Sequence, residues 1–229
     1  MSPKSYWTET LPEPLPANPL AVVADWLAQA RADGTQPNPN AMVLATVDDR
    51  GRPSARVVLC KEIEVDAGAI LFYTNYASRK GRELDGNARV AVVFHWDQRH
   101  RQVRAEGEVR RLTDVENDAY FVSRPWQSRL GAWASAQSQP VESRAALNAA
   151  VAATARRFGI DYAGPGSAEP ADVDVVVPRP PNWGGFRLTV DALELWVEGE
   201  FRIHDRAVWT RNVSQPESAS SWKVSRLQP

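Results

Sequence analysis

Apolar residues recur at every second position, or in short continuous runs, over most of the chain between residues 41 and 111. The runs are AMVLATV, SARVVL, AILFYT, VAVVFHW and QVRAEGEVRRL, with polar turns and one charged stretch between them. Short strands at this spacing, with Gly and Asp in the turns, predict an antiparallel meander or barrel rather than alternating β-α-β units. After residue 183, GFRLTV, ALELWV, FRIHDRAVWT and SWKVSRL predict strands that rejoin this first sheet.

Helical periodicity appears before and between these strands. Asn18 is a candidate N-cap and Pro19 occupies the favoured first position of a helix that we expect from Pro19 to Ala32, with Gly34 as its stop. Ser78 is a candidate cap for a short helical turn in SRKGREL. A capping box, Thr113-Asp114-Val115-Glu116, predicts a helix to Ser123 that stops at Pro125, and an Ala-rich helix is expected from about Val141 to Phe158.

The segments without periodicity define the expected organisation. Residues 1–17 are rich in proline and predict an extended arm, whereas residues 18–229 are expected to form one α+β domain. Residues 159–182, rich in Pro, Gly and Asp, predict a long loop of the kind that serves as a lid or an interface arm.

Charge and composition restrict the function classes. The 229 residues include 27 basic and 28 acidic side chains, a net charge of −1, which argues against a general nucleic-acid binder. The single cysteine, Cys60, excludes an internal disulfide, and no targeting segment or membrane helix is evident, so a cytoplasmic protein is expected. The nine tryptophans are unusual, because a buried indole N–H needs a partner.

Basic residues are concentrated between Arg50 and Arg111, and two groups there are candidate anion sites. Ser78, Arg79 and Lys80 place a hydroxyl and two cations at an expected helix N-terminus, which suits a phosphate about as well as it suits an ordinary helix start. Arg56 and Lys61 lie five residues apart and should point to opposite faces of a strand unless a bulge intervenes. They can also be read as the basic ends of a buried strand.

Two further groups carry candidate chemistry. Tyr120, Arg124 and Ser128 recur at intervals of four, which stacks a phenol, a guanidinium and a hydroxyl on one helix face, although Pro125 interrupts the run and a surface network is an equal alternative. Arg202, His204 and Arg206 alternate, so they are expected on one face of a strand around an electron-rich ligand. The spacing of His and Cys predicts no metal site.

In this order, the motifs resemble those of the pyridoxamine 5′-phosphate oxidase family. They are NAMVLATVDDRGRPSARVVLCK, FYTNYASRKGREL, RQVRAEG, AYFVSRP, SRLGAWASAQSQP, WGGFRL, LELW and RIHDR. The resemblance implies an FMN-binding split β-barrel with flanking helices and antiparallel strands. It also implies a homodimer with two sites at the subunit interface, a small-molecule substrate, and neither a nucleic acid nor a membrane partner.

The resemblance assigns these residues to two phosphates and one reacting ring. Lys61, Tyr120, Arg124 and Ser128 would hold the substrate's phosphate, and Arg202 and His204 would face its pyridine ring as the catalytic pair. The set implied for FMN is Arg56, Val57, Val58, Leu59, Lys61, Tyr73, Thr74, Ser78, Arg79, Lys80, Gln102, Gln137, Ser138, Trp196 and Arg206.

The implied reaction is oxidation of pyridoxamine or pyridoxine 5′-phosphate to pyridoxal 5′-phosphate, with dioxygen as acceptor and hydrogen peroxide as product. The chain departs from the family pattern near Lys4-Ser5-Tyr6, in the length of the loop 159–182, and in the polar insert NVSQPESASS. These departures keep two alternatives open. One is a paralogous flavin oxidase of secondary metabolism, similar to those of phenazine biosynthesis, and the other is a non-catalytic flavin or B6-phosphate carrier.

Overall fold

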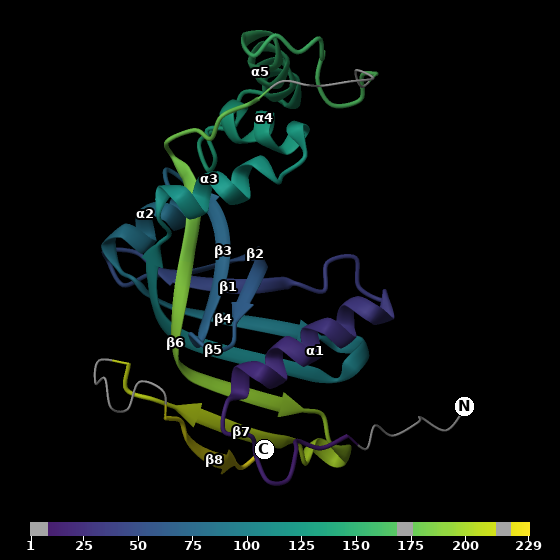
Figure 1. Ribbon diagram of the computed structural model, residues 1–229, viewed down its shortest axis with the longest axis vertical. Coiled ribbons are helices and arrows are strands. Elements are labelled where there is room, and N and C mark those ends of the chain that lie inside the picture. The colour runs from purple at the N-terminus through teal and green to yellow at the C-terminus, as the bar shows by residue number, and fades with distance from the viewer. Residues whose placement is uncertain (1–8, 169–175, 214–220) are drawn as a thin grey trace. The chain divides into compact units, whose positions relative to one another are not determined.

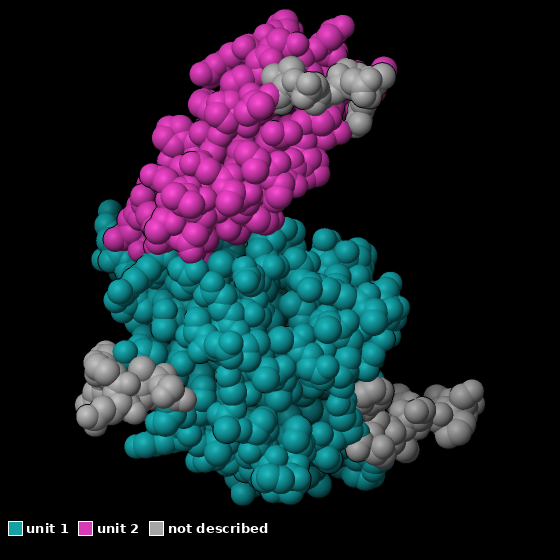
Figure 2. All heavy atoms as spheres, in the orientation of Figure 1, with its two compact units in different colours: residues 1–72, 86–110, 187–229 teal, residues 73–85, 111–186 magenta. Residues whose placement is uncertain are grey.

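The computed structural model describes residues 9–168, 176–213 and 221–229, and these form two compact units (Figures 1 and 2). Unit 1 comprises Met1–Phe72, Gly86–Arg110 and Arg187–Pro229, and unit 2 comprises Tyr73–Asp85 and Arg111–Phe186. Lys4 to Tyr6 and most of the insert NVSQPESASS lie outside the described residues, as does the middle of the loop 159–182.

Antiparallel strands form the sheet, in the order β3-β2-β1-β4-β5-β6-β7-β8. An additional pairing between β3 and β6 closes six of the strands into a barrel, and together with the helices this confirms the predicted α+β class. The strands are β1 (Ala41–Val47), β2 (Pro53–Glu64), β3 (Ala69–Asn75), β4 (Arg89–Trp96), β5 (Arg101–Arg111), β6 (Trp183–Val197), β7 (Asp205–Thr210) and β8 (Lys223–Leu227).

Burial alternates along β1, β4 and β5 as the period of two predicts. In β4, Val90, Val92, Phe94 and Trp96 are buried and the residues between them are not. Trp96 is fully buried and donates from its indole to the carbonyl of Pro39 at 2.8 Å. The hydrophobic effect and this satisfied donor together explain why the indole can be buried here.

Helix α1 (Pro19–Asp33) forms as the sequence predicts. The side chain of Asn18 accepts a hydrogen bond from the amide of Leu20 at 3.0 Å, and Gly34 ends the helix in the left-handed conformation with φ 63°. The predicted apolar face is buried. Its cap and its buried face thus agree with the sequence in every particular.

The other helices lie in unit 2 and differ from the prediction in their ends. They are α2 (Arg79–Gly86), α3 (Asp114–Val122), α4 (Trp126–Ala134) and α5 (Arg144–Arg157). The capping box at Thr113 and Glu116 is present. The predicted start of the Ala-rich helix at Val141 was wrong, because Ser143 caps α5 by accepting from Ala146. Helix α4 was not predicted.

Two C-terminal expectations also need correction. GFRLTV and ALELWV form one continuous strand, β6. The segment FRIHDRAVWT is not a strand from its beginning, because residues 200–202 form a tight 3₁₀ turn and β7 begins only at Asp205. Phe201 and Arg202 both have positive φ, at 54° and 67°, which no extended strand permits.

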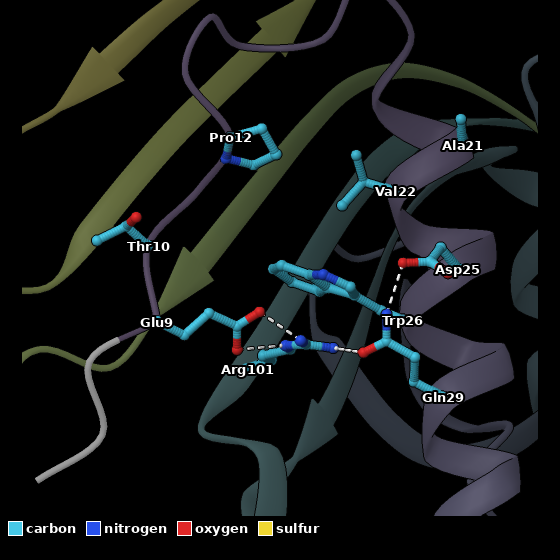
Figure 3. A pocket seen from close by; sticks show the side chains of 9 residues that line it. All are labelled: Glu9, Thr10, Pro12, Ala21, Val22, Asp25, Trp26, Gln29 and Arg101. Carbon is cyan, nitrogen blue, oxygen red and sulfur yellow. Dashed lines mark hydrogen bonds and ion pairs between the residues drawn. The ribbon is translucent and has the colours of Figure 1, made fainter.

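The described part of the N-terminal segment packs against the barrel unit. Glu9 forms an ion pair with the buried guanidinium of Arg101, which also donates to Gln29 at 2.8 Å. A cavity of about 380 Å³ lies beside this pair, with Trp26 of α1 among its lining residues (Figure 3). No helix in the described ranges has the length and apolar character that crossing a membrane would require.

Candidate functional site

Lys80 joins three segments of unit 2 that are far apart in the sequence. Its Nζ donates to Gln137 Oε1 at 2.7 Å, to Thr74 Oγ1 at 2.9 Å and to Ser78 Oγ at 3.3 Å. Four of the residues assigned to FMN are therefore in direct contact. They come from the end of β3, from the start of α2 and from the segment after α4.

The N-terminus of α2 has the donors that an anion needs. Ser78 is fully buried and caps the helix by accepting from the amide of Gly81 at 3.2 Å, as predicted. Arg79 pairs with the buried Glu83 at 2.7 Å, and its side chain stays 58% exposed. A helix N-terminus with a neighbouring ammonium and guanidinium fits a phosphate in charge and in hydrogen bonding. We call Thr74, Ser78, Arg79, Lys80 and Gln137 the α2 cluster.

Gly81 holds α2 close to the chain before it. A Cβ at this position would lie 2.1 Å from the carbonyl oxygen of Tyr76, a backbone atom that cannot move aside as a flexible side chain could. We therefore expect Gly81→Ala to lower the free energy of unfolding by about 2 kcal/mol or more. Urea denaturation followed by circular dichroism measures this.

Gly86, the last residue of the same helix, supplies the matched control. A Cβ there meets nothing within 4 Å, so Gly86→Ala should leave stability unchanged or raise it by less than about 1 kcal/mol. Equal stability of the two variants would contradict the close approach at Gly81.

An aromatic stack forms the second part of unit 2's site. The rings of Tyr73 and Tyr120 stack with centroids 4.0 Å apart, and Trp183 stacks on Tyr73 at 5.2 Å. The guanidinium carbon of Arg124 lies 4.6 Å from the centroid of Trp183 and 5.2 Å from that of Phe121. Tyr120 and Arg124, expected together, are thus joined by flat rings that restrict their positions.

Arg124 is electrostatically unusual. Its Nη1 atom is buried and has no hydrogen-bond partner among the described residues. The pKa of Arg124 is lowered because burial disfavours the charged form, and the nearby charge of Arg129 adds to this shift. A buried guanidinium in this state is a strong receptor for an anion.

The predicted helix face through Tyr120, Arg124 and Ser128 is not continuous. Tyr120 lies in α3, Arg124 lies between the two helices, and Ser128 is exposed in the first turn of α4. Pro125 causes the break, because its ring cannot continue the preceding helix. The helical periodicity expected for these three side chains is therefore broken between α3 and α4.

Unit 1 holds the residues assigned to β2. Arg56 donates to the carbonyl of Leu44 at 3.1 Å and to the buried Thr46 at 2.5 Å, on the same face as the buried Val58. Val57 and Leu59 are exposed on the opposite face together with Lys61. A register shift falls between Cys60 and Glu62. Arg56 and Lys61 thus lie on opposite faces, because the irregularity begins only at Lys61.

His204 has a defined orientation next to Trp196. The two ring centroids are 4.7 Å apart, and His204 Nδ1 accepts from the amide of Gly199 at 3.2 Å. In the neutral ring this leaves the proton on Nε2. A Cβ at Gly199 would lie 1.8 Å from the carbonyl oxygen of Ile203, so the tight turn needs glycine there.

The predicted common strand face of Arg202, His204 and Arg206 is wrong. Arg202 lies in the turn with positive φ, and only Arg206 lies on β7, opposite Trp196. Arg206 forms an ion pair with the buried Glu194 at 2.8 Å. Gln102 lies half-buried on β5, opposite His95, and Ser138 is exposed after α4 with φ 70°.

Sequence reasoning missed three residues of this arrangement. Glu194 also pairs with Arg104 at 3.1 Å, so it compensates two cations of unit 1. Trp183 was noted only as part of a motif, and Arg129 was not considered. Glu194 and Trp196 lie two residues apart on β6, and this alternation was the one feature of the sequence that could have indicated a role for Glu194. Nothing in the sequence around Arg129 indicates that it belongs to a site.

The chain is similar to two family models and to several known proteins. The family model described as Pyridoxamine 5′-phosphate oxidase matches residues 18–157, and the Pyridoxine 5′-phosphate oxidase C-terminal dimerisation region matches residues 183–229. A pyridoxine/pyridoxamine 5′-phosphate oxidase of Roseobacter denitrificans is 46% identical over 93% of this chain and 94% of its own. A pyridoxine/pyridoxamine 5′-phosphate oxidase of Burkholderia mallei is 45% identical over 93% of this chain and 89% of its own.

Two solved structures are also similar. PhzG from Burkholderia lata 383, in complex with tetrahydrophenazine-1-carboxylic acid, superposes with a TM-score of 0.78 at 29% identity, over 93% of this chain and 94% of that one. A pyridoxamine 5′-phosphate oxidase-related, FMN binding protein from Nostoc punctiforme superposes with a TM-score of 0.67 at 16% identity, over 91% of this chain and 96% of that one. This similarity shows that the two chains share a fold.

Proposed function

The chain belongs to the pyridoxamine 5′-phosphate oxidase family and is an oxidoreductase of that type, and from this premise we propose its reaction. It oxidises pyridoxamine or pyridoxine 5′-phosphate to pyridoxal 5′-phosphate, with FMN as cofactor and dioxygen as acceptor. Relatives that share 45–46% of its residues carry that name, which favours this substrate.

The observation that carries the proposal is the state of Arg124. A guanidinium whose buried Nη1 has no partner in the described part of the chain costs stability, unless a ligand supplies an anion. The phosphate of a B6 vitamer is such an anion. Tyr120 and Arg124 would bind it together with Lys61 and Ser128, so that the phosphate fixes the position of the pyridine ring.

The α2 cluster would bind the phosphate of FMN. Its hydroxyl, ammonium and guanidinium groups at a helix N-terminus suit a phosphate monoester. When bound, FMN would supply the two-electron redox chemistry that couples oxidation at C4′ of the substrate to reduction of dioxygen to hydrogen peroxide. The further residues proposed to hold FMN are Arg56, Val57, Val58, Leu59, Lys61, Tyr73, Gln102, Ser138, Trp196 and Arg206.

Arg202 and His204 are the proposed catalytic pair. The hydrogen bond from Gly199 to Nδ1 makes Nε2 the donor of the neutral His204 ring, which suits a hydrogen bond to the hydroxyl group on the substrate's pyridine ring. Arg202 would polarise the pyridine as charge moves toward the cofactor. The dimerisation region over residues 183–229 contains both residues, which supports a homodimer with its two sites at the subunit interface.

The purified protein with FMN should turn over pyridoxamine 5′-phosphate in air, releasing hydrogen peroxide and the aldehyde. Absorbance of the aldehyde and a peroxidase-coupled assay measure the two products independently. Absence of turnover with both pyridoxamine and pyridoxine 5′-phosphate would overturn the proposal. Bound flavin that no B6 substrate reduces anaerobically would instead indicate a carrier.

Lys80→Met should weaken FMN binding about tenfold or more, because it removes a charge-assisted contact to the cofactor's phosphate. Flavin fluorescence quenching during titration measures the dissociation constant. Arg82→Met, an exposed change on the same helix, is the control and should bind FMN as the wild type does. Equal affinity of the two variants would remove Lys80 from the proposed FMN site.

A second candidate function rests on the similarity to PhzG, whose structure holds a tricyclic carboxylic acid. A paralogous oxidase of this kind would bind FMN but bind B6 phosphates poorly. Comparing turnover of pyridoxamine 5′-phosphate with that of a reduced phenazine carboxylic acid distinguishes the two. We favour the B6 phosphate, because its charge matches the cations gathered around Arg124.

A further inference from the structure

Arg129 also has a partly buried guanidinium, and it has no role in the proposed substrate or FMN sites. It lies in the first turns of α4, in the helix that begins two residues after Arg124. Its Nε atom is buried and, like Nη1 of Arg124, has no hydrogen-bond partner among the described residues. No carboxylate within the described ranges forms an ion pair with either guanidinium.

Two guanidinium groups near each other are unfavourable without an anion between them. Burial lowers the pKa of Arg124, and repulsion by the charge of Arg129 adds to this shift. Elsewhere in unit 2, Arg179 shows the usual solution, because Asp114 and Asp118 bind it at 2.7 and 2.6 Å. The pair Arg124 and Arg129 has no such acid in the described residues, and an anionic ligand would supply the counter-charge.

The surroundings of Arg129 favour a phosphate at this point. Pro125 precedes α4, and no side-chain hydrogen bond caps this helix. Ser128 adds a hydroxyl, and Tyr120 adds a phenol that interacts with the charge of Arg124. Two guanidinium groups with these donors match a dianion better than a monoanion.

We propose that Arg129 is a specificity-determining residue that binds the 5′-phosphate of the substrate together with Arg124 and makes the site select a doubly charged ligand. The inference rests on the proposed function, since it assigns a further contact to the same substrate. Arg129 therefore contributes to substrate affinity and not to FMN binding or to the chemical step.

The test measures binding of three ligands to the FMN-loaded protein by calorimetry: pyridoxal 5′-phosphate, its singly charged 5′-sulfate analogue, and unphosphorylated pyridoxal. Arg129→Gln should weaken binding of the phosphate about tenfold, that of the sulfate about threefold, and that of pyridoxal less than twofold. Arg129→Lys, which keeps the charge, should recover part of the loss. Arg156→Gln, an exposed change on α5, is the matched control and should alter none of the three.

The outcomes separate this inference from the function on which it rests. The role of Arg129 would be overturned if Arg129→Gln bound pyridoxal 5′-phosphate as tightly as the wild type, or if its affinity fell equally for all three ligands. The proposed function would then still stand, provided that the wild-type protein turns over its substrate. If purified Arg129→Gln contained less flavin per protein, as measured by absorbance, the anion near Arg129 would belong to FMN, and this result would also overturn the proposed role of Arg129. Wild-type protein that neither binds nor oxidises B6 phosphates would instead overturn the proposed function. Inorganic phosphate then serves as the probe, and its binding should still weaken in Arg129→Gln.

Discussion

Replacing Arg202 by methionine is expected to lower kcat about 100-fold or more, with little change in the affinity for FMN. Methionine keeps the length and most of the apolar volume of the side chain but removes the charge that would stabilise the transition state. The neighbouring His204 keeps its hydrogen bond from Gly199 and its contact with Trp196 in this variant. Steady-state kinetics with pyridoxamine 5′-phosphate, and fluorescence titration of FMN, measure the two quantities.

The control for this prediction is Arg110→Met, which removes a guanidinium that is 83% exposed on β5 of the same unit. Its kcat should equal that of the wild type. A loss of FMN affinity in Arg202→Met as large as the loss of kcat would contradict the assignment of Arg202 to the substrate. So would an unchanged kcat.

Arg124→Met is expected to raise KM for pyridoxamine 5′-phosphate about 100-fold while leaving the ligand-free protein as stable as the wild type. The loss of affinity follows from removal of a desolvated, charge-assisted contact to the phosphate. Stability is preserved because the buried Nη1 has no protein partner in the described ranges to lose, and its desolvation cost disappears with it. The lost contacts with Trp183 and Phe121 offset part of this gain.

Initial-rate kinetics and thermal unfolding without ligand test both parts. The free energy of unfolding should stay within about 1 kcal/mol of the wild-type value. Arg144→Met, an exposed change at the start of α5, should alter neither quantity. A strongly destabilised Arg124→Met protein would show that Arg124 has a structural role, and an unchanged KM would remove it from the substrate site.

The fold could be predicted where local signals agreed with each other. Helix α1 has its cap, its first proline, its buried stripe and its final glycine where periodicity and capping rules place them. The strands β1, β4 and β5 follow their alternation, because one face of each is buried. Prediction failed in FRIHDRAVWT, whose residues favour a strand but whose tight turn at Gly199 to Arg202 is imposed by close backbone packing.

The candidate site could be predicted only as residue types. Ser78, Arg79 and Lys80 were recognisable because a helix N-terminus is a local feature, but the contact of Lys80 with Gln137 joins positions 57 residues apart. For Arg124, the sequence showed a cation near a proline. Its burial, its missing partner and its proximity to Arg129 depend on how α3, α4 and the ring of Trp183 pack together.

The order of apolar and polar residues along the chain was sufficient for the antiparallel class and for α1, since hydrophobic periodicity and capping act over a few neighbouring positions. Packing of distant segments was needed to show which cations are compensated, as Arg206 is by Glu194, and which have no acidic partner among the described residues, as with Arg124 and Arg129. Burial and ion pairing are properties of space rather than of sequence position. For that reason the anion site of this protein became specific only in three dimensions.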